Sequence, residues 1–584
     1  MILSLTLAVS AVGTLTDGQL IRGDVNGDNA VNMKDVLVLR KYIAGLDVAF
    51  AEHSCEATAA GEVICGNVNG DDAVNMKDVL LMRKYLAGLD VTFAEHTCNQ
   101  PTQPPTTVKT NPPTTVKTDP PTTTTTVYIP NEQESDPKTF DLVTLSFNNS
   151  SASDYGVMFH SYSTLGEPMV QIVEGDTDDP AAFANATEIE ARSRSASTKE
   201  WDNYDLETYE FDYDWSRRGS MTTPITTYFH KAKLTGLKYS TTYSYRVGNK
   251  LTDTWSPIYT FTTRPETVGD FSFIYTADTQ PDLGDKKAYV GMNMLFNKAF
   301  TTAPNAAFML SGGDFIYCSE EGQGAISQWR NVINGCNNFN VDAQGVSGGA
   351  GSLFAEHPWM VANGNHDNNV LQNFFNNVTV VSAKQYFSFD YGNTHIIFLD
   401  SGLEGNIDSV QQNWLAKDLA ETNQKFKMVF LHWSFYCHNQ RDLKGSSRDV
   451  TKLFDQYGVD FVVSGHVNTD FYTTYPVKNA EVATKESTLE GDTNYFAGGA
   501  GSIYLQNGAS GLGSDMKEAG RKGALYGNGT TWGQLMLHPI RAGIESSFMV
   551  VDVTSNKLTL NRYYLDKSLN VQRYDVGQVG VVRN

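Results

Sequence analysis

The sequence has few cysteines, no excess of basic residues and no long apolar segment. Only 6 of 584 residues are cysteine, so disulfide bonds do not define the fold of a chain of this length. Asp and Glu (66) outnumber Lys and Arg (44), which gives a formal net charge of −22. Such a surface repels phosphate backbones, so nucleic-acid binding is not expected. After the N-terminus, no stretch reaches the ~18 apolar residues that a membrane-spanning helix needs.

The length exceeds what one hydrophobic core supports, so 584 residues predict two to four domains. Residues 2–12 are apolar and resemble the hydrophobic part of a secretory signal, although the first basic residue is Arg22. We therefore interpret residues 1–18 as a candidate signal segment. The predicted location of the protein is secreted and extracellular.

An internal repeat of 43 residues follows, in which Gly23–Asp35 recurs as Gly66–Asp78. Each copy places oxygen-bearing side chains at loop positions 1, 3, 5, 9 and 12, the spacing by which a hard cation such as Ca²⁺ is coordinated. Asx-rich turns are the structural alternative, but two copies with the same ligand pattern favour two calcium sites. The predicted calcium ligands are Asp24, Asn26, Asp28, Asn32 and Asp35, then Asn67, Asn69, Asp71, Asn75 and Asp78.

Each loop leads into an apolar run that begins a helix, 36–39 in the first copy and 79–82 in the second. Residues 19–98 thereby resemble a type I dockerin, a small α module with two calcium loops. The resemblance implies binding to a cohesin domain of a scaffoldin, in a cell-surface complex of the cellulosome type. Loop positions 10 and 11, where dockerins contact cohesin, hold the same pair in both copies: Met33 and Lys34, then Met76 and Lys77.

Residues 99–137 are rich in Pro and Thr and predict an extended, semi-rigid linker. The pattern then changes to short strands and turns, with strands expected at 142–147, 154–160 and 242–247. Residues 138–265 resemble the fibronectin type III-like sandwich that precedes the catalytic domain of purple acid phosphatases. No catalytic constellation is evident in this segment.

Beyond residue 265, five apolar strands each end in side chains that can bind a metal, and helix-length segments such as 410–422 separate them. Alternating strands and helices indicate a layered α/β core, and the carboxyl ends of parallel strands meet at one edge of a sheet. The side chains at these ends are Asp278 and Gln280, Asp314, Asn365 and His366, His432, and His466 with Asn468.

These residue types suit a centre with two metal ions. Two cations about 3.5–4 Å apart can hold both the attacking and the leaving oxygen of a displacement at phosphorus. A carboxylate such as Asp314 can bridge the cations, while neutral imidazoles and an amide oxygen add no further negative charge near a phosphate. Taken singly, His432 or the Asn365–His366 pair could be structural, but the ordered set of five favours a metal site.

In this order the segments resemble the calcineurin-like metallophosphoesterase superfamily, and Gly313-Asp314-x-x-Tyr317 has the form found in purple acid phosphatases. The resemblance implies a four-layer α/β sandwich over residues 266–584. It also implies an acid phosphatase that hydrolyses phosphate monoesters by attack of a metal-bound hydroxide. The implied transition metals are Fe with Zn, Mn or Fe.

The resemblance also implies a role for each matching residue. Asp278 would bind the first metal, Asp314 would bridge the two, and Tyr317 would be a phenolate ligand of a ferric ion. A second, divalent metal would be held by Asn365, His432 and His466. The catalytic residue His366 would bind phosphate and help to protonate the leaving oxygen.

Two departures from the family pattern concern the first metal. Asn468 replaces the last His of Gly-His-x-His, and Gln280 stands where relatives have Gly or His. Amide oxygens are weaker ligands than imidazole, so we predict a first metal that is loosely held, exchangeable or absent. His395 and His438 are less favoured substitutes, since His395 fits a strand over 394–399.

Two other functions stay open. The site could act on phosphodiesters or cleave nucleotides, because the loops around the leaving group carry no recognisable signature. Alternatively, the domain could be a catalytically impaired binding module, because of Asn468 and Gln280.

Overall fold

The computed structural model describes Met82 and residues 140–200, 223–280, 286–316, 326–333, 353–367, 385–436, 443, 445–467, 471–507, 533–538, 546–566, 570–574 and 578–584. The chain divides into two units, Met1–Thr122 and Thr123–Asn584, and everything described except Met82 belongs to the second. The predicted signal segment, calcium ligands, cohesin contacts and linker lie outside the described residues.

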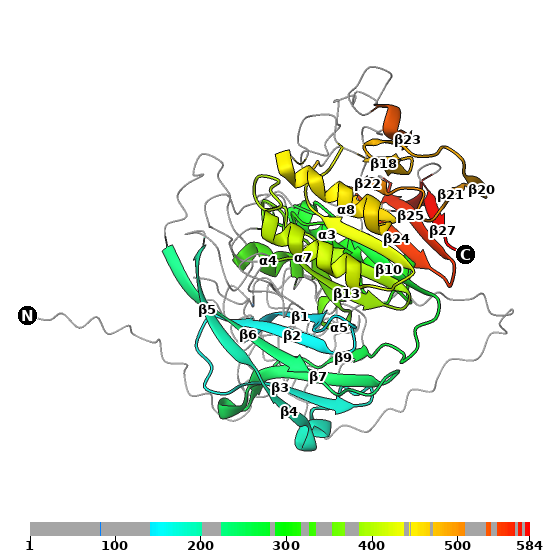
Figure 1. Cartoon of the computed structure of the whole chain (residues 1–584). Helices are drawn as coiled ribbons and strands as arrows, with labels where there is room; N and C mark the ends of the chain where they lie inside the picture. The colour runs from blue at the N-terminus through cyan, green and yellow to red at the C-terminus, as the bar shows by residue number, and fades with distance from the viewer. Residues whose placement is uncertain are drawn as a thin grey trace, which may run out of the picture. The chain divides into compact units, whose positions relative to one another are not determined.

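The second unit begins with two antiparallel sheets, in the orders β1-β2-β6-β5 and β4-β3-β7-β8, with β9 also paired to β7 (Figure 1). Along β7, Tyr243, Tyr245 and Val247 alternate with more polar residues and join the core, as the period of a strand requires. The bounds are β1 (Asp141–Phe147), β2 (Tyr155–Ser161), β3 (Pro168–Glu174), η1 (Pro180–Asn185), β4 (Thr187–Glu190), β5 (Arg192–Glu200), β6 (Thr223–Leu234), β7 (Thr242–Asn249), η3 (Lys250–Thr252), β8 (Thr254–Trp255) and β9 (Tyr259–Thr262).

The rest of the unit contains two larger mixed sheets. The first has the order β12-β11-β10-β24-β25-β27-β21-β20, with β26 on β25, and the second has the order β13-β14-β15-β16-β22-β17-β23. The strands of the first sheet are β10 (Phe271–Thr276), β11 (Met309–Ser311), β12 (Trp359–Val361), β20 (Thr488–Glu490), β21 (Thr493–Ala497), β24 (Ser547–Val553), β25 (Lys557–Leu565), β26 (Val571–Arg573) and β27 (Val579–Val582). Those of the second are β13 (Phe387–Tyr391), β14 (Thr394–Phe398), β15 (Phe426–Leu431), β16 (Phe461–Ser464), β17 (Phe471–Thr474), β22 (Ile503–Asn507) and β23 (Met536–His538).

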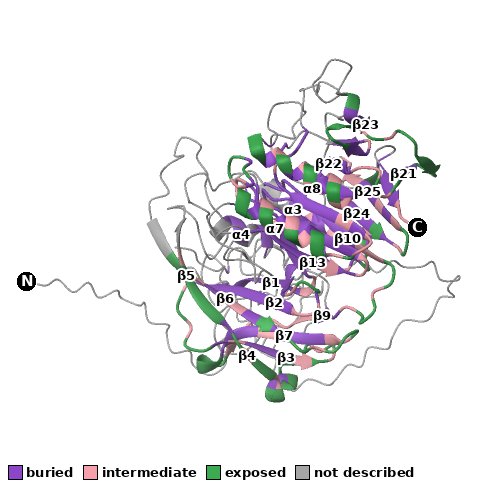
Figure 2. Ribbon diagram, in the orientation of Figure 1, coloured by how far each residue is buried: buried purple, intermediate pink, exposed green. Residues whose placement is uncertain are grey.

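Helices cover these sheets and bury apolar faces against them. Leu415 of α7 and Phe454 of α8 share a core cluster with Val429 of the second sheet, whereas Phe296 of α3 packs with Ile274 of the first. Figure 2 shows buried strands such as β10 and β24, and exposed residues on the outer surfaces of α7 and α8. The helices and short elements are α3 (Lys286–Thr302), α4 (Ile326–Ile333), α5 (Leu353–Glu356), α7 (Ser409–Glu421), η4 (Gly445–Asp449), α8 (Val450–Tyr457), η6 (Gly533–Leu535) and the hairpin β18 (Val477–Lys478) and β19 (Glu481–Val482).

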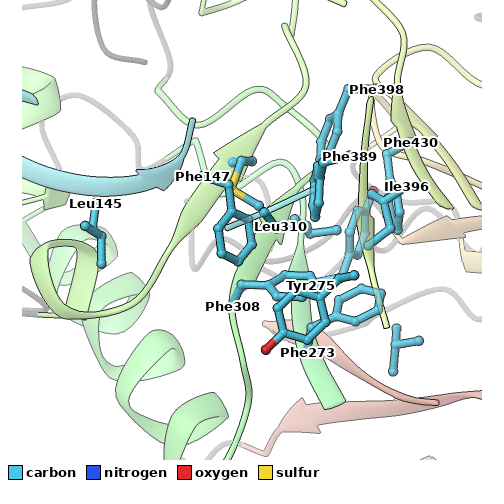
Figure 3. Close-up of a cluster of buried hydrophobic side chains, with 14 of the residues drawn as sticks. Leu145, Phe147, Phe273, Tyr275, Phe308, Leu310, Phe389, Ile396, Phe398 and Phe430 are labelled. Carbon is cyan, nitrogen blue, oxygen red and sulfur yellow. The ribbon is translucent and has the colours of Figure 1, made fainter. Parts of the chain in front are cut away.

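An aromatic core lies between the two larger sheets and reaches into the β-sandwich. Phe273 stacks on Phe308 with ring centroids 4.9 Å apart, and Phe147 of β1 lies 5.6 Å from Phe308 and 5.4 Å from Phe389 (Figure 3). The Tyr245 hydroxyl donates to the Ala355 carbonyl at 2.6 Å. The sandwich therefore shares a core with the α/β domain.

The predicted fold class is confirmed for this unit as a β-sandwich followed by an α/β domain with two sheets between helices. Strands β10, β11 and β12 are parallel neighbours, as are β14, β15 and β16. The predicted site residues follow the carboxyl ends of β10, β11, β12, β15 and β16. Within the described ranges, none of the helices combines the length and the apolar character needed to cross a membrane.

Candidate metal centre

Four donor atoms from four strand ends converge at the carboxyl edges of the two sheets. Nε2 of His432 lies 3.1 Å from Oδ2 of Asp314 and 3.0 Å from Oδ1 of Asn365. Nδ1 of His466 lies 2.9 Å from the same Asn365 oxygen and 3.1 Å from Nε2 of His432. Neighbouring ligands of one cation are about 3 Å apart when metal–ligand bonds are about 2.0–2.2 Å long. The four atoms therefore have the spacing of a coordination shell.

The protonation of His432 supports the same conclusion. Its Nδ1 lies 2.9 Å from the Gly312 carbonyl oxygen, which can only accept, so Nδ1 carries a proton and Nε2 is the nitrogen turned toward Asp314 and Asn365. Burial opposes the charging of His432, but Asp314 and Asp278 outweigh it and raise its pKa to about 9. In the absence of a metal, the Nε2 position is therefore occupied by a proton that Asp314 stabilises. A cation would take the place of this proton and would be stabilised by the same carboxylate.

Asp278 joins the centre from the end of β10. Its two carboxylate oxygens accept from the His466 backbone N–H at 2.8 and 3.0 Å. Burial raises the pKa of the Asp278 carboxyl well above its usual range, and His432 partly counters this rise. Asp278 thus lies against the backbone of one donor residue and holds it in place.

Left-handed backbone is concentrated at the centre. Asp278 (φ 53°), Asp314 (φ 51°) and His466 (φ 75°) are non-glycine residues with positive φ, a conformation that costs roughly 1–3 kcal/mol each. The neighbouring glycines leave the space that these turns need. A Cβ on Gly465 would lie 2.3 Å from Asp278 Oδ2, and one on Gly364 would lie 2.1 Å from the Asp314 nitrogen.

Gln280 contacts the central carboxylate. Its Nε2 donates to Asp314 Oδ2 at 2.8 Å, and its backbone N–H donates to the Asp314 carbonyl at 3.2 Å. The structure thus places an amide donor against the oxygen that faces His432. Tyr317 and Asn468, the other residues predicted for the first metal, lie outside the described residues.

His366 is half-buried beside the centre, and its backbone N–H donates to Asp314 Oδ1 at 2.9 Å. The predicted site residues that the structure describes are therefore all brought together: Asp278, Gln280, Asp314, Asn365, His366, His432 and His466. Their roles in binding and catalysis remain predictions.

Asp367 is a buried residue that the sequence did not single out. Its Oδ1 accepts from the backbone N–H groups of Phe315 (2.7 Å) and Ile316 (3.2 Å), and its Oδ2 accepts from Gly364 (3.2 Å). It therefore ties the turn that carries Asp314 to the turn that carries the Asn365–His366 pair. The sequence feature that could have indicated a role for Asp367 is its position directly after Gly364-Asn365-His366.

Trp433 is the second residue that the sequence left unassigned. Its indole ring stacks on the His466 imidazole, with centroids 3.8 Å apart and planes 24° apart. Its position directly after His432 gave no indication of this contact.

His395 lies in β14, as the strand interpretation predicted. Its Nδ1 lies 2.6 Å from Asp390 Oδ1 and its Nε2 lies 2.9 Å from Asp418 Oδ2. Both ring nitrogens are thus engaged by carboxylates of β13 and α7. His395 is not part of the centre, and His438 lies outside the described residues.

Comparisons with known proteins agree with this geometry. Residues 141–263 match the family model "Purple acid Phosphatase, N-terminal domain", and residues 271–470 match "Calcineurin-like phosphoesterase". Purple acid phosphatase 15 of Arabidopsis thaliana is 24% identical over 273 residues, covering 41% of this chain and 48% of that protein. Purple acid phosphatase 13 of the same plant is 22% identical over 326 residues, covering 49% of this chain and 54% of that protein. The chain thus spans about half the length of these relatives.

A solved structure gives the same architecture. Purple acid phosphatase PPD1 from yellow lupin seeds superposes with a TM-score of 0.53 at 15% identity, covering 77% of this chain and 75% of that one. At this identity the likeness concerns the fold alone.

The fold and the donor set resemble those of calcineurin-like phosphoesterases, and the buried Asp314, His432 and His466 are placed where a metal ion could bind. The matched sandwich in front of it adds a second similarity to purple acid phosphatases. The predicted resemblance to these phosphoesterases is confirmed, while the dockerin stays a prediction.

Proposed function

We propose that the chain hydrolyses phosphate monoesters at the centre formed by Asp314, Asn365, His432 and His466. The observation that carries the proposal is the convergence of four donor atoms at 2.9–3.1 Å, from four separate strand ends, with Asp314, His432 and His466 buried. Divalent or trivalent cations bound there would acidify water and neutralise charge on a phosphate.

The residues of the chain have separate tasks in this proposal. Asp314, His432, Asn365 and His466 would hold the cation, with Asp314 oriented by Gln280 and His432 by the Gly312 carbonyl. Asp278 fixes the His466 backbone. His366, half-buried beside Asp314, binds the phosphate and donates a proton to the leaving oxygen. Pre-organised groups of this kind reduce reorganisation during the reaction.

The test is hydrolysis of p-nitrophenyl phosphate and bis-p-nitrophenyl phosphate by the full chain, before and after chelation and after return of Zn²⁺, Mn²⁺ or Fe. We expect activity that is lost on chelation and restored by metal, with the monoester preferred. Asp314→Asn should lower kcat by at least about 10²-fold, the scale of removing one electrostatic group. The matched control Asp179→Asn changes an exposed cap of η1 and should leave activity unchanged.

Other outcomes decide against the proposal in defined ways. A preference for the diester would make the chain a phosphodiesterase on the same site. Activity that appears only in Asn468→His or Gln280→His would indicate an impaired binding module. Turnover that persists at full rate after complete metal removal would contradict the metal centre itself.

The N-terminal repeat is proposed to bind two Ca²⁺ ions and to attach the enzyme to a cohesin outside the cell. The duplicated ligand pattern and the identical pairs Met33–Lys34 and Met76–Lys77 support this proposal. Calcium-dependent binding of the full chain to a panel of cohesins tests it. Replacing one pair should preserve binding, whereas replacing both should abolish it; binding unaffected by calcium would contradict the assignment.

A further inference from the structure

Trp433 has an unusual relation to the metal centre. It directly follows one donor residue, His432, while its indole ring lies face to face with another, His466, at a centroid distance of 3.8 Å. The two residues come from neighbouring strands, β15 and β16. Trp433 is thus the sequence neighbour of one donor residue, His432, and the stacking partner of another, His466.

The loop after β14 fixes the position of the indole. The Trp433 backbone N–H donates to Ser401 Oγ at 3.2 Å. Gly405 lies against the indole, since a Cβ there would be 2.8 Å from Trp433 Cε3, and its φ of 70° also favours glycine. The ring is therefore confined between Gly405 and the His466 imidazole. Among the described residues, the buried Nε1 has no hydrogen-bond partner, so stacking and not a polar contact sets its orientation.

His466 needs such support. Its backbone is left-handed at φ 75°, and its Nδ1 must point at Asn365 Oδ1 and His432 Nε2. Asp278 fixes the His466 backbone through the N–H, and the Nδ1 contacts hold one edge of the imidazole. The flat indole lies against the face of the ring and adds a restraint on its rotation about χ1 and χ2.

We propose that Trp433 is a positioning residue of the metal centre, which holds the His466 ring in its ligating orientation. This inference rests on the proposed function, because it assumes that the centre binds a cation. Coordination through Nδ1 withdraws electrons from the imidazole, and an electron-poor ring is attracted more strongly to the indole face. The stack is therefore stronger in the metal-bound state than in the metal-free state and contributes to metal affinity.

The experiment is titration of the full metal-free chain with Co²⁺, with Ca²⁺ in excess to saturate the N-terminal loops. Absorption of bound Co²⁺ gives the dissociation constant, and tryptophan fluorescence reports quenching at the centre. Trp433→Leu should weaken Co²⁺ binding about tenfold, the scale of losing a residue that orients a ligand. Trp433→Phe keeps an aromatic face and should recover most of the affinity, but it should lose the quenching that Trp433 contributes.

Trp255→Leu is the matched control, since this half-buried indole of β8 belongs to the sandwich and stacks with Arg246. It should leave the Co²⁺ dissociation constant unchanged. Equal affinity of Trp433→Leu and the wild type would overturn the proposal, as would a Trp433→Phe variant that binds no better than Trp433→Leu. If Trp433→Leu does not fold, Trp433→Met takes its place: a Co²⁺ dissociation constant equal to that of the wild type overturns the proposal, and a weaker affinity that Trp433→Phe recovers supports it.

The same titration separates this inference from the proposed function. A wild-type chain that binds no Co²⁺ at the centre refutes the metal centre, and with it the hydrolase. A wild type that binds Co²⁺ tightly, alongside a Trp433→Leu variant of equal affinity, refutes only the positioning role.

Discussion

Replacing Asp367 should destabilise the α/β domain far more than replacing an exposed Asp with a similar hydrogen-bonding role. The fully buried carboxylate accepts three backbone N–H groups, from Phe315, Ile316 and Gly364, at 2.7–3.2 Å. Asp367→Ala leaves all three donors without an acceptor, and each buried unsatisfied group costs about 1–3 kcal/mol. Because the three share one site and some relaxation is expected, we predict a loss of about 3–5 kcal/mol in the free energy of unfolding.

Asp367→Asn should cost less. One oxygen still accepts from Phe315 and Ile316, while the new amide nitrogen faces the Gly364 N–H as a second donor. Burial and the neighbouring Asp314 raise the pKa of Asp367 to about 7, so removing its charge also relieves repulsion. We therefore predict a loss of about 1–2 kcal/mol for Asp367→Asn.

Urea denaturation of the full chain at pH 7.5, followed by tryptophan fluorescence, gives the two values. The matched control is Asp179→Ala, since Asp179 accepts the Ala181 N–H at 2.9 Å in an exposed cap, where water can replace it. This control should change stability by at most about 1 kcal/mol. The reasoning is refuted if Asp367→Ala costs no more than the control, or if the Asn variant is the less stable of the two Asp367 variants.

Three further predictions concern other parts of the molecule. Burial disfavours protonated His395, but Asp390 and Asp418 outweigh this effect and raise its pKa from 6.5 to about 9. Protonated His395 therefore stabilises the folded state fully below pH 6.5, and this contribution is lost as the pH rises through 9. Between pH 6 and pH 10 the free energy of unfolding should fall by roughly 2–3 kcal/mol less in His395→Gln than in the wild type, as measured by urea denaturation. Gln280→His should raise the transition metal bound per chain, measured by elemental analysis; an unchanged ratio would mean that Gln280 does not limit the first metal. Phe308→Ala should cost about 3–5 kcal/mol by thermal unfolding, since the fully buried ring packs between the sheets and the sandwich.

The strand ends of the α/β domain could be predicted because local sequence determines them. The run 271–276 is β10 in the structure, and the expected helix over 410–422 is α7, Ser409–Glu421. Buried parallel strands are apolar throughout and end abruptly in polar residues, so the boundary is visible in the sequence. The order of these boundaries also predicted which side chains meet, because parallel strands present their carboxyl ends at one edge.

Contacts between side chains from different strands could not be predicted in the same way. Nothing near Trp433 indicates that its ring meets His466, which lies 33 positions later in the chain. The same holds for Asp367, whose partners Phe315 and Ile316 precede it by about 50 residues. Such contacts depend on the separation and twist of neighbouring strands, which local patterns do not contain.

The left-handed residues explain why the centre needs the surrounding core. Asp278, Asp314 and His466 adopt a conformation that each would avoid in a free peptide, at a cost of roughly 1–3 kcal/mol apiece. The adjacent glycines make room for these turns, and hydrogen bonds such as that from the His466 N–H to Asp278 stabilise them. Further compensation comes from burial of the strands that enter these turns, such as β16, which is buried throughout, and β10, whose last four residues are buried. The positions of the donor atoms therefore depend on the folded sheets that carry them.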